Sequence, residues 1–433
     1  MDKMADVLGR AGAWCGQNKY LSAIKNAFQN FMPLTIAGAI GVLWCNVLVN
    51  DQTGLGLFFK PIMALDFLNP AFQAVNFCTI SCITVGITLG IAQEIGVWNM
   101  GAERAGYIPG LVGLAAWLSV TNTSHMVDGA KEAFTGVAGN ELGATGLFTG
   151  MIIGVLSVEL FCFFEKQDAL KIKMPEQVPP GVARAFEVLV PATITLIITA
   201  CIGSACYNLT GLYLNDVIKN GIQGPLGAVG ATIPGVMIIY LVIMLFWLVG
   251  IHGNNMLSAV KEALFTPLAL ENVEAFNKGE TPKNIINMYA LQMWGEFGGS
   301  GVTIGLVIAI MIFGKREDNK AIATLSLVPG LFNINETVTF GIPMVLNPIL
   351  GIPFVVAPLV TIIIGYVLTV IGFCPVACLT VPWTTPPIVF GFLATGANVM
   401  GAVTQAILIV STVIYVPFLI SYEKYQNKQA AEA

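Results

Sequence analysis

The sequence predicts an all-α, polytopic membrane protein, and three observations lead to this fold class. Hydrophobic residues make up 56% of the 433 residues and charged residues only 10%. Apolar windows of about 20 residues, the length that a helix needs to cross a bilayer, recur along the chain. The 46 glycines and 22 prolines favour closely packed and interrupted helices, which are common where a helix bundle lines a pathway.

The N-terminal segment is predicted to be an amphipathic helix at the membrane surface, before the first span. Leu21, Ile24, Phe28 and Phe31 recur at helical spacing, with lysines close by. The alternative is a first transmembrane helix that starts earlier. The segment has no short apolar core followed by a small-residue cleavage site, so we expect no signal peptide.

Nine apolar windows are predicted to cross the membrane, at residues 33–49, 72–92, 106–120, 144–164, 186–206, 229–251, 298–314, 350–372 and 399–420. Two further apolar tracts, 321–349 and 374–396, contain several prolines and, in the first, polar residues. Such backbone is tolerated at membrane depth only where protein encloses it or where it lines a watery cavity. We therefore expect re-entrant hairpins or broken helices in both tracts.

Basic residues in the short loops predict that both termini lie in the cytoplasm. Lysines and arginines gather in the N-terminal segment, in the loop from Glu165 to Arg184 and in the C-terminal tail. The same loop divides the chain into residues 1–184 and 185–433. Because the unusual polar residues follow the loop, we expect residues 1–184 to form a scaffold and dimerisation half. Residues 185–433 are expected to bind the substrate and to contain the re-entrant hairpins.

The composition indicates no metal, cofactor or nucleic acid. The nine cysteines are scattered, mostly within apolar spans, and none forms a CxxC pair. The net charge of -5 gives no sign of nucleic-acid binding. An ATP-driven pump is disfavoured because the chain has no GxxxxGK[ST] loop.

A histidine ends one long apolar window, in the sequence FWLVGIHGNN. Gly250 and Gly253 permit a tight turn and a close backbone approach around His252, and Asn254 and Asn255 add two amides. A lone histidine on an apolar helix is often structural. Three hydrogen-bonding side chains where water is scarce instead indicate a binding site, so we predict that all three contact a ligand.

An acid with two amides lies in the broken tract, in the sequence FNINETVTFGIP. Burying an ionised carboxylate in a low-dielectric medium is costly unless it is paired, which makes Glu336 a functional candidate. Together with Asn333 and Asn335 it can accept from and donate to vicinal hydroxyls, as a neutral, polyhydroxylated ligand requires. The alternative is a polar network that caps a broken helix.

Two more candidates lie in neighbouring tracts. Trp383, in the sequence VPWTTPP, offers a flat apolar face to a sugar ring, or it belongs to a rigid structural turn. Glu296, in the sequence LQMWGEFGGSG, is either a ligand contact or a solvated loop acid.

These motifs together resemble a known family. FNINETVTFGIPMVLNPILGIP, FWLVGIHGNN, VPWTTPP and the loop MPEQVPPGVARAF look like the membrane-spanning enzyme IIC of the phosphoenolpyruvate-dependent sugar phosphotransferase system. The likeness is to its lactose, cellobiose and N,N'-diacetylchitobiose group, and it extends over nearly the whole chain in the same order. Members often have proline after the glutamate, where this chain has Thr337. This departure concerns backbone stiffness more than the ligand groups.

The resemblance implies a homodimer in the bacterial inner membrane, with about ten transmembrane helices in each subunit and re-entrant hairpins that enclose a disaccharide. The acid and the histidine of the family correspond to Glu336 and His252, which would both take part in catalysis. A separate, phosphorylated IIB protein would phosphorylate the 6-hydroxyl of the sugar from the cytoplasmic side. Because only a short tail follows Tyr422, we expect no fused IIB domain.

An ion-coupled secondary sugar transporter is the alternative, with Glu336 and His252 as a proton relay. A channel is less well suited, since a cluster of amides and an acid favours binding over rapid permeation. The phosphoryl donor distinguishes the two transporters. A phosphotransferase permease accumulates phosphorylated sugar when IIB is supplied, whereas a symporter needs a proton gradient and leaves the sugar unmodified.

Overall fold

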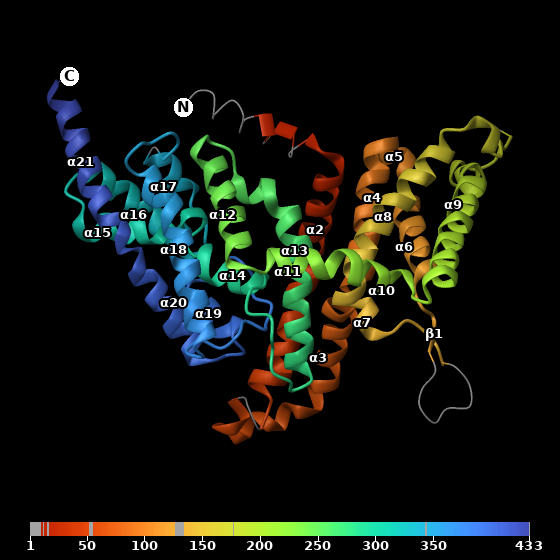
Figure 1. Ribbon diagram of the computed structural model, residues 1–433, viewed down its shortest axis with the longest axis horizontal. Helices are drawn as coiled ribbons and strands as arrows, with labels where there is room; N and C mark the ends of the chain where they lie inside the picture. Colours follow the sequence, from red (N-terminus) through yellow and green to blue (C-terminus); the bar gives the residue numbers. More distant parts are fainter. Residues whose placement is uncertain are drawn as a thin grey trace. The chain divides into compact units, whose positions relative to one another are not determined.

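The protein is predominantly helical, as predicted (Figure 1). The computed structural model describes residues 10–11, 13–14, 17–51, 55–125, 134–175, 177–342 and 344–432. Within these ranges the strands are limited to one antiparallel ribbon of β1 (Ser124–His125) and β2 (Phe134–Thr135).

The chain forms two compact units. The N-terminal unit comprises residues 17–38 and 74–227, and the C-terminal unit comprises the rest of the chain. These units divide the chain at other positions than the predicted boundary between residues 184 and 185, because the segment 39–73 packs with the later helices. The assignment of a scaffold role and a binding role to residues 1–184 and 185–433 stays a prediction.

The N-terminal unit is a bundle of apolar helices in which α4, α6, α8 and α9 are the main members. Its helical elements are α2 (Lys19–Leu43), α3 (Asn69–Asn76), η4 (Phe77–Ser81), α4 (Ile83–Met100), α5 (Ala102–Ala105), α6 (Ile108–Val120), α7 (Gly139–Leu142), α8 (Ala144–Glu165), η5 (Asp168–Leu170), α9 (Pro180–Thr210), α10 (Leu214–Ile218), η6 (Lys219–Gln223) and α11 (Gly224–Gly230). Three of them, α2, α3 and α11, continue into the other unit.

Glycines let these helices approach closely. A Cβ atom added at Gly113 of α6 would lie 2.3 Å from the Cβ of Ala92 in α4. One added at Gly150 of α8 would lie 2.2 Å from the hydroxyl oxygen of Thr88 in α4. Larger residues at these two positions would therefore force the helices apart, and the predicted packing through small residues is confirmed here.

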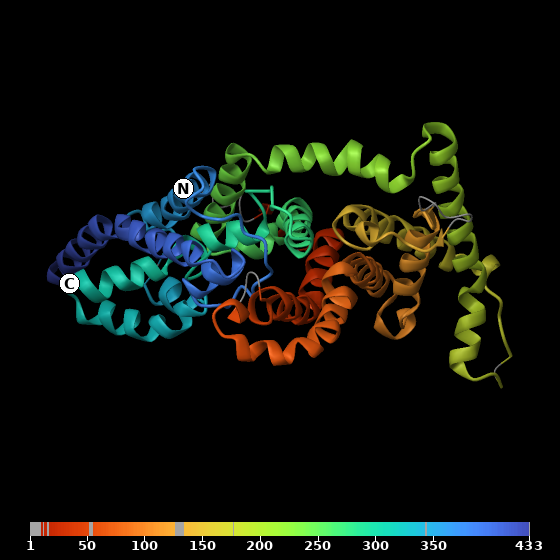
Figure 2. The ribbon, with the colours of Figure 1, turned by 90° about the horizontal axis from the view of Figure 1, so that it is seen from below.

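The C-terminal unit contains the remaining elements, which are η1 (Trp44–Leu48), η2 (Leu55–Leu57), η3 (Lys60–Leu68), α12 (Ile233–Leu248), α13 (Gly253–Asn277), α14 (Met288–Gly295), η7 (Ser300–Val302), α15 (Ile304–Phe313), α16 (Glu317–Leu331), α17 (Glu336–Gly341), α18 (Gly351–Val370), α19 (Val389–Ala394), α20 (Val399–Ser411), η8 (Thr412–Ile414) and α21 (Tyr415–Glu432). Helices α15 and α16 form a hairpin beside α21 (Figures 1 and 2). The buried carboxylate of Glu423 accepts the backbone N–H of Lys315 at 2.9 Å and so joins the hairpin turn to α21.

The first helix corresponds to the alternative that we considered for the N-terminal segment. Helix α2 runs without a break over Lys19–Leu43 and contains Pro33. We predicted a surface segment followed by a separate span from residue 33, but the described residues form one continuous helix across this position. Since the helix and its π-helical continuation are together 30 residues long, they exceed what one straight crossing of a bilayer needs.

Both tracts that we expected to be broken contain irregular backbone. In the first, α16 ends at Leu331, two residues after Pro329, and the next helix, α17, has only six residues. In the second, α19 alone is helical. A further break interrupts the predicted span 298–314, where η7 and α15 meet in a helix pair bent by 59°. That span therefore does not begin as a straight helix.

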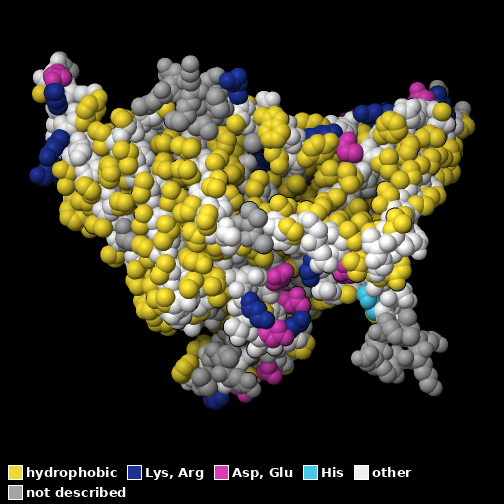
Figure 3. All heavy atoms as spheres, in the orientation of Figure 1, with side chains coloured by type: hydrophobic (Ala, Val, Ile, Leu, Met, Phe, Trp, Pro, Cys, Tyr) yellow, Lys and Arg dark blue, Asp and Glu magenta, His cyan; other side chains and the backbone are white. Residues whose placement is uncertain are grey.

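Apolar side chains cover much of the face that Figure 3 shows. Large exposed examples include Ile197 and Leu209 on α9 and Ile352 and Val367 on α18. Among the described residues, five helices are long and apolar enough to cross a membrane, or up to seven if each bent pair is one span. The chain therefore has the helices of a multi-pass membrane protein, whereas the number ten stays a prediction.

Candidate functional site

The turn between α12 and α13 presents His252. Gly250 has a left-handed backbone with φ +81°, and a Cβ at Gly253 would lie 2.0 Å from the carbonyl oxygen of Ile243. Both glycines are thus required by the geometry, as the sequence predicted. The indole of Trp247 supports the imidazole, with ring centroids 4.5 Å apart.

The proton on His252 can be assigned from its contacts. Its Nδ1 accepts the backbone N–H of Asn255 at 3.3 Å, which caps the start of α13. A nitrogen that accepts cannot carry a proton, so the neutral ring carries it on Nε2. The neutral imidazole can therefore donate a hydrogen bond through Nε2.

Glu336 faces His252 across a short gap. Its Oε1 lies 3.9 Å from Nε2 of His252, which is longer than a hydrogen bond. The side chains are 48% and 38% exposed, respectively. The acid is therefore not enclosed, contrary to the expectation of a buried carboxylate, because it starts the short helix α17 and stays open on one side. A hydroxyl placed between the two groups could donate to Glu336 and accept from His252.

Asn333 joins three segments of the C-terminal unit. Its backbone is left-handed with φ +63°, which asparagine tolerates better than most residues. Its side-chain oxygen accepts the N–H of Gly298 at 2.6 Å. Its amide nitrogen donates to the carbonyl oxygens of Trp383 and Thr385. The loop before α17 is thereby fixed beside the glycine turn and the VPWTTPP tract.

Asn335 adds a second connection in the same place. It is 4% exposed, and its amide donates to the carbonyl oxygen of Ser300 at 2.8 Å. Since the side chains of Asn333 and Asn335 already bond to backbone, their observed contacts hold the loop that carries Glu336. Their predicted contact with a substrate stays a prediction.

We expect the substitution Asn333→Ala to destabilise the protein by about 1–3 kcal/mol, since it removes the partner of the N–H of the buried Gly298 and of two carbonyl groups. Asn333→Gly is the matched control, because it also removes the amide but accepts the left-handed backbone. The free energy of unfolding in mixed micelles is measured for both variants. If the glycine variant loses less stability than the alanine variant, the difference measures the strain of placing alanine in the left-handed backbone. No loss of stability in either variant would contradict the connecting role of Asn333.

Trp383 has an exposed side chain, and Asn254 has a side-chain oxygen without a partner. The indole of Trp383 is 44% exposed, while its carbonyl oxygen is bound by Asn333. The side-chain oxygen of Asn254 is buried and has no hydrogen-bond partner among the described residues. Asn255 is exposed, and its backbone rather than its amide contacts His252.

Glu296 belongs to a buried ion pair that the sequence did not predict. It accepts from the ammonium group of Lys261 and, at 2.7 Å, from the hydroxyl of Tyr240. Lys261 is 5% exposed and lies over the Tyr240 ring. Glu296 is thus not a solvated loop acid. The one sequence feature that could have indicated this network is the Lys261–Glu262 pair in the largely apolar tract after His252.

Comparison with known proteins places these features in a family context. The family model described as "Phosphotransferase system, EIIC" matches residues 25–358. The chain is 33% identical to the oligo-beta-mannoside-specific EIIC component of Bacillus subtilis (strain 168), over 98% of this chain and 94% of that protein. It is 31% identical to the cellobiose-specific EIIC component of Lactococcus lactis subsp. lactis (strain IL1403), over 98% of each.

A solved structure has the same fold. It is the crystal structure of the transporter ChbC, the IIC component from the N,N'-diacetylchitobiose-specific phosphotransferase system. The TM-score is 0.88 and the sequence identity is 30%, over 97% of each chain.

Proposed function

The chain belongs to the EIIC family, the membrane permeases of sugar phosphotransferase systems, and we propose that it carries a disaccharide of the cellobiose or diacetylchitobiose type. The named relatives are specific for oligo-beta-mannosides, cellobiose and diacetylchitobiose, which are all β-linked sugars. The observation that carries the proposal is the half-exposed pair of Glu336 and His252, with 3.9 Å between the facing atoms.

In this proposal the 6-hydroxyl of the sugar lies between Glu336 and His252. The hydroxyl oxygen accepts the N–H of Nε2, and the hydroxyl proton points to the carboxylate. When the hydroxyl oxygen attacks the phosphorus atom on phosphorylated IIB, the bond from phosphorus to IIB breaks and Glu336 takes the proton. Phosphoryl transfer depends chiefly on positioning and charge stabilisation, so the permease needs few reacting groups.

The other candidate residues would hold the sugar. Trp383 would stack on the apolar face of a sugar ring, and the unpartnered oxygen of Asn254 would accept from a hydroxyl. Asn255 and the amides of Asn333 and Asn335 would add contacts at the edge of the site. Glu296 is bound by Lys261 and Tyr240, so we assign it to positioning the wall of the site beside His252.

The assembly that we propose is a homodimer in the bacterial inner membrane, with both termini in the cytoplasm. Residues 1–184 would provide the scaffold and dimer contacts, and residues 185–433 the sugar site with its re-entrant hairpins. The basic loop between Glu165 and Arg184 supports this orientation through the positive-inside rule. A separate IIB protein would reach the sugar from the cytoplasmic side.

Transport into vesicles tests the function. Vesicles with phosphorylated IIB on the cytoplasmic side are expected to accumulate phosphorylated cellobiose or diacetylchitobiose without a proton gradient. Unmodified sugar that accumulates only with a proton gradient would instead support a proton relay of Glu336 and His252, which the phosphotransferase relatives do not favour.

We expect His252→Ala to reduce phosphorylation by about 10- to 100-fold and to weaken sugar binding no more than that, since it removes one hydrogen bond to the reacting hydroxyl. His252→Gln is the matched control, because its amide can still donate. Single-turnover phosphorylation and sugar titration separate the two effects. Activity of the alanine variant at the wild-type level would leave His252 with only its role as the cap of α13.

A further inference from the structure

A cleft lies in the N-terminal unit, where α8 ends and α9 begins. Its volume is about 680 Å³, and its cationic lining residues are Arg104, Lys171, Lys173 and Arg184. Helices α8 and α9 are both long and apolar enough to cross a membrane. The cleft therefore lies at the end of two candidate spans, at the level where lipid headgroups meet the protein.

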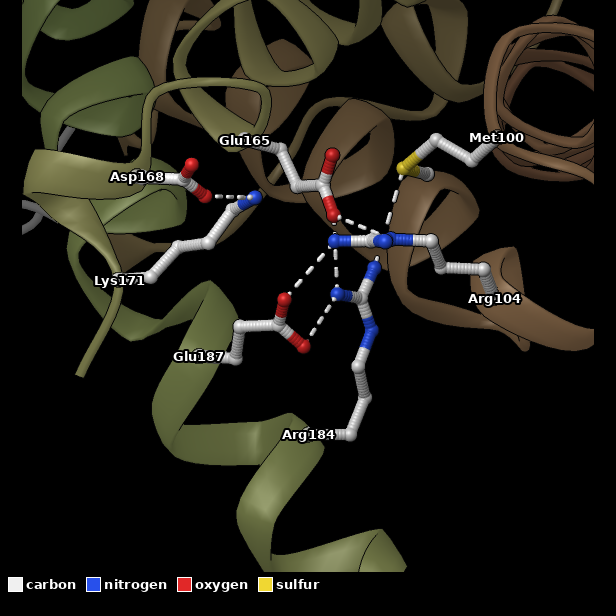
Figure 4. Close-up of polar contacts among 7 residues, drawn as sticks. All are labelled: Met100, Arg104, Glu165, Asp168, Lys171, Arg184 and Glu187. Carbon is white, nitrogen blue, oxygen red and sulfur yellow. Dashed lines mark hydrogen bonds and ion pairs between the residues drawn. The ribbon is translucent and has the colours of Figure 1, made fainter. Parts of the chain in front are cut away.

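Two arginines and two glutamates form a closed network in this cleft (Figure 4). Arg104 donates to Glu165 and to Glu187, both at 2.8 Å. Arg184 donates to the same two carboxylates, both at 2.9 Å. Since Glu165 is 3% exposed, the network is anchored in the bundle. The two positive and two negative charges cancel, and both guanidinium groups are fixed in position.

The donors around the network outnumber its acceptors. Nη2 of Arg184 has only the sulfur of Met100, at 3.8 Å, and its Nε is buried without a partner among the described residues. Lys171 pairs with the exposed Asp168 at 3.0 Å. Lys173 adds a positive charge with no hydrogen bond or direct ion pair in the described part of the chain. Such an excess of cationic donors fits an anionic acceptor.

Apolar side chains beside the cleft indicate which anion fits. Ile172 and Met174 line the cleft together with the lysines. On α9, Val182, Phe186 and Leu189 are exposed close to Arg184 in sequence. A free phosphate ion gains nothing from this surface, whereas a phospholipid has both a phosphate and acyl chains. Basic pockets between membrane helices bind the headgroups of anionic lipids in this way.

We propose that this cleft binds the headgroup of an anionic phospholipid such as phosphatidylglycerol. The phosphate contacts Arg184, Lys171 and Lys173, and the acyl chains lie along the apolar face of α9. The N-terminus of α9 adds a favourable dipole at the same place. The inference concerns the N-terminal unit alone and does not depend on the sugar site.

Native mass spectrometry of the full chain in detergent tests this proposal. Phosphatidylglycerol and phosphatidylcholine with the same acyl chains serve as probes. The wild-type protein is expected to retain phosphatidylglycerol in preference. The double variant Lys171→Gln, Lys173→Gln is expected to bind it about 5- to 30-fold more weakly, with binding of phosphatidylcholine unchanged. The variant Lys424→Gln, Lys428→Gln removes the same charge elsewhere and is expected to behave like the wild type.

Several outcomes would overturn the proposal. Equal retention of the two lipids by the wild-type protein would show that the cleft does not select an anion. An equal loss of phosphatidylglycerol binding in both double variants would show that the effect comes from the net charge of the protein and not from the cleft. Displacement of phosphatidylglycerol by inorganic phosphate alone would indicate a phosphate site. Loss of IIB binding in the Lys171, Lys173 variant, with lipid binding intact, would indicate a surface for that protein.

Discussion

Replacing Glu336 by glutamine is expected to slow sugar phosphorylation by about 100- to 10,000-fold, the range that a positioned general base contributes. Glutamine keeps the shape of the side chain and can still accept a hydrogen bond from a hydroxyl, but it cannot take the proton. Sugar affinity should therefore fall much less than the rate. Initial rates with phosphorylated IIB in vesicles and calorimetric titration of the sugar measure the two quantities.

The control for this substitution is Glu317→Gln in the same unit. That carboxylate is 87% exposed and pairs with Lys320 at the surface, so its loss should leave transport unchanged. Wild-type binding and phosphorylation in the Glu336 variant would remove this residue from the mechanism. A parallel fall in affinity and rate would assign Glu336 to sugar binding without proton transfer.

Replacing Lys261 by methionine should destabilise the protein by about 3–5 kcal/mol, because it leaves the carboxylate of Glu296 in a buried site without its cation. Methionine has nearly the volume of lysine, so the effect reflects charge more than packing. The free energy of unfolding in mixed micelles is the measurement. The double variant Lys261→Met, Glu296→Gln should recover most of the loss, since no unpaired charge remains.

Lys278→Met provides a matched control near the end of α13. Lys278 pairs with Glu274 on the exposed surface, where ion pairs contribute little. We therefore expect little change in stability there. Equal effects of the two methionine variants, or no recovery in the double variant, would contradict the assignment of Lys261 and Glu296 as a buried pair.

Much of the fold follows from patterns that are local in sequence. Apolar windows predict most of the long helices, and prolines with polar residues predict the interruptions on either side of α17. The bend before α15 was missed, because an apolar window contains no information on the positive φ angles at Gly298, Gly299 and Gly301. The separation of α2 into two parts was also wrong, since Pro33 is tolerated inside the helix.

The sequence predicted those parts of the candidate site that contain residue types rarely found in apolar tracts. A histidine and a carboxylate are rare in such a tract, and the structure places His252 and Glu336 opposite each other. The partners of Asn333 lie 35 to 52 positions away, so no spacing rule could reveal that its amide is bound to backbone. Lys261 was missed for the same reason, because Glu296 lies 35 positions further along the chain.

The bonds of Asn333 also set an order of events while the protein is being made. The carbonyl groups of Trp383 and Thr385 leave the ribosome 50 and 52 residues after the asparagine that binds them. Closing such a long loop costs entropy that only the completed contacts offset. A nascent chain that ends before Trp383 therefore lacks the fixed loop that presents Glu336, however many membrane helices it has already formed.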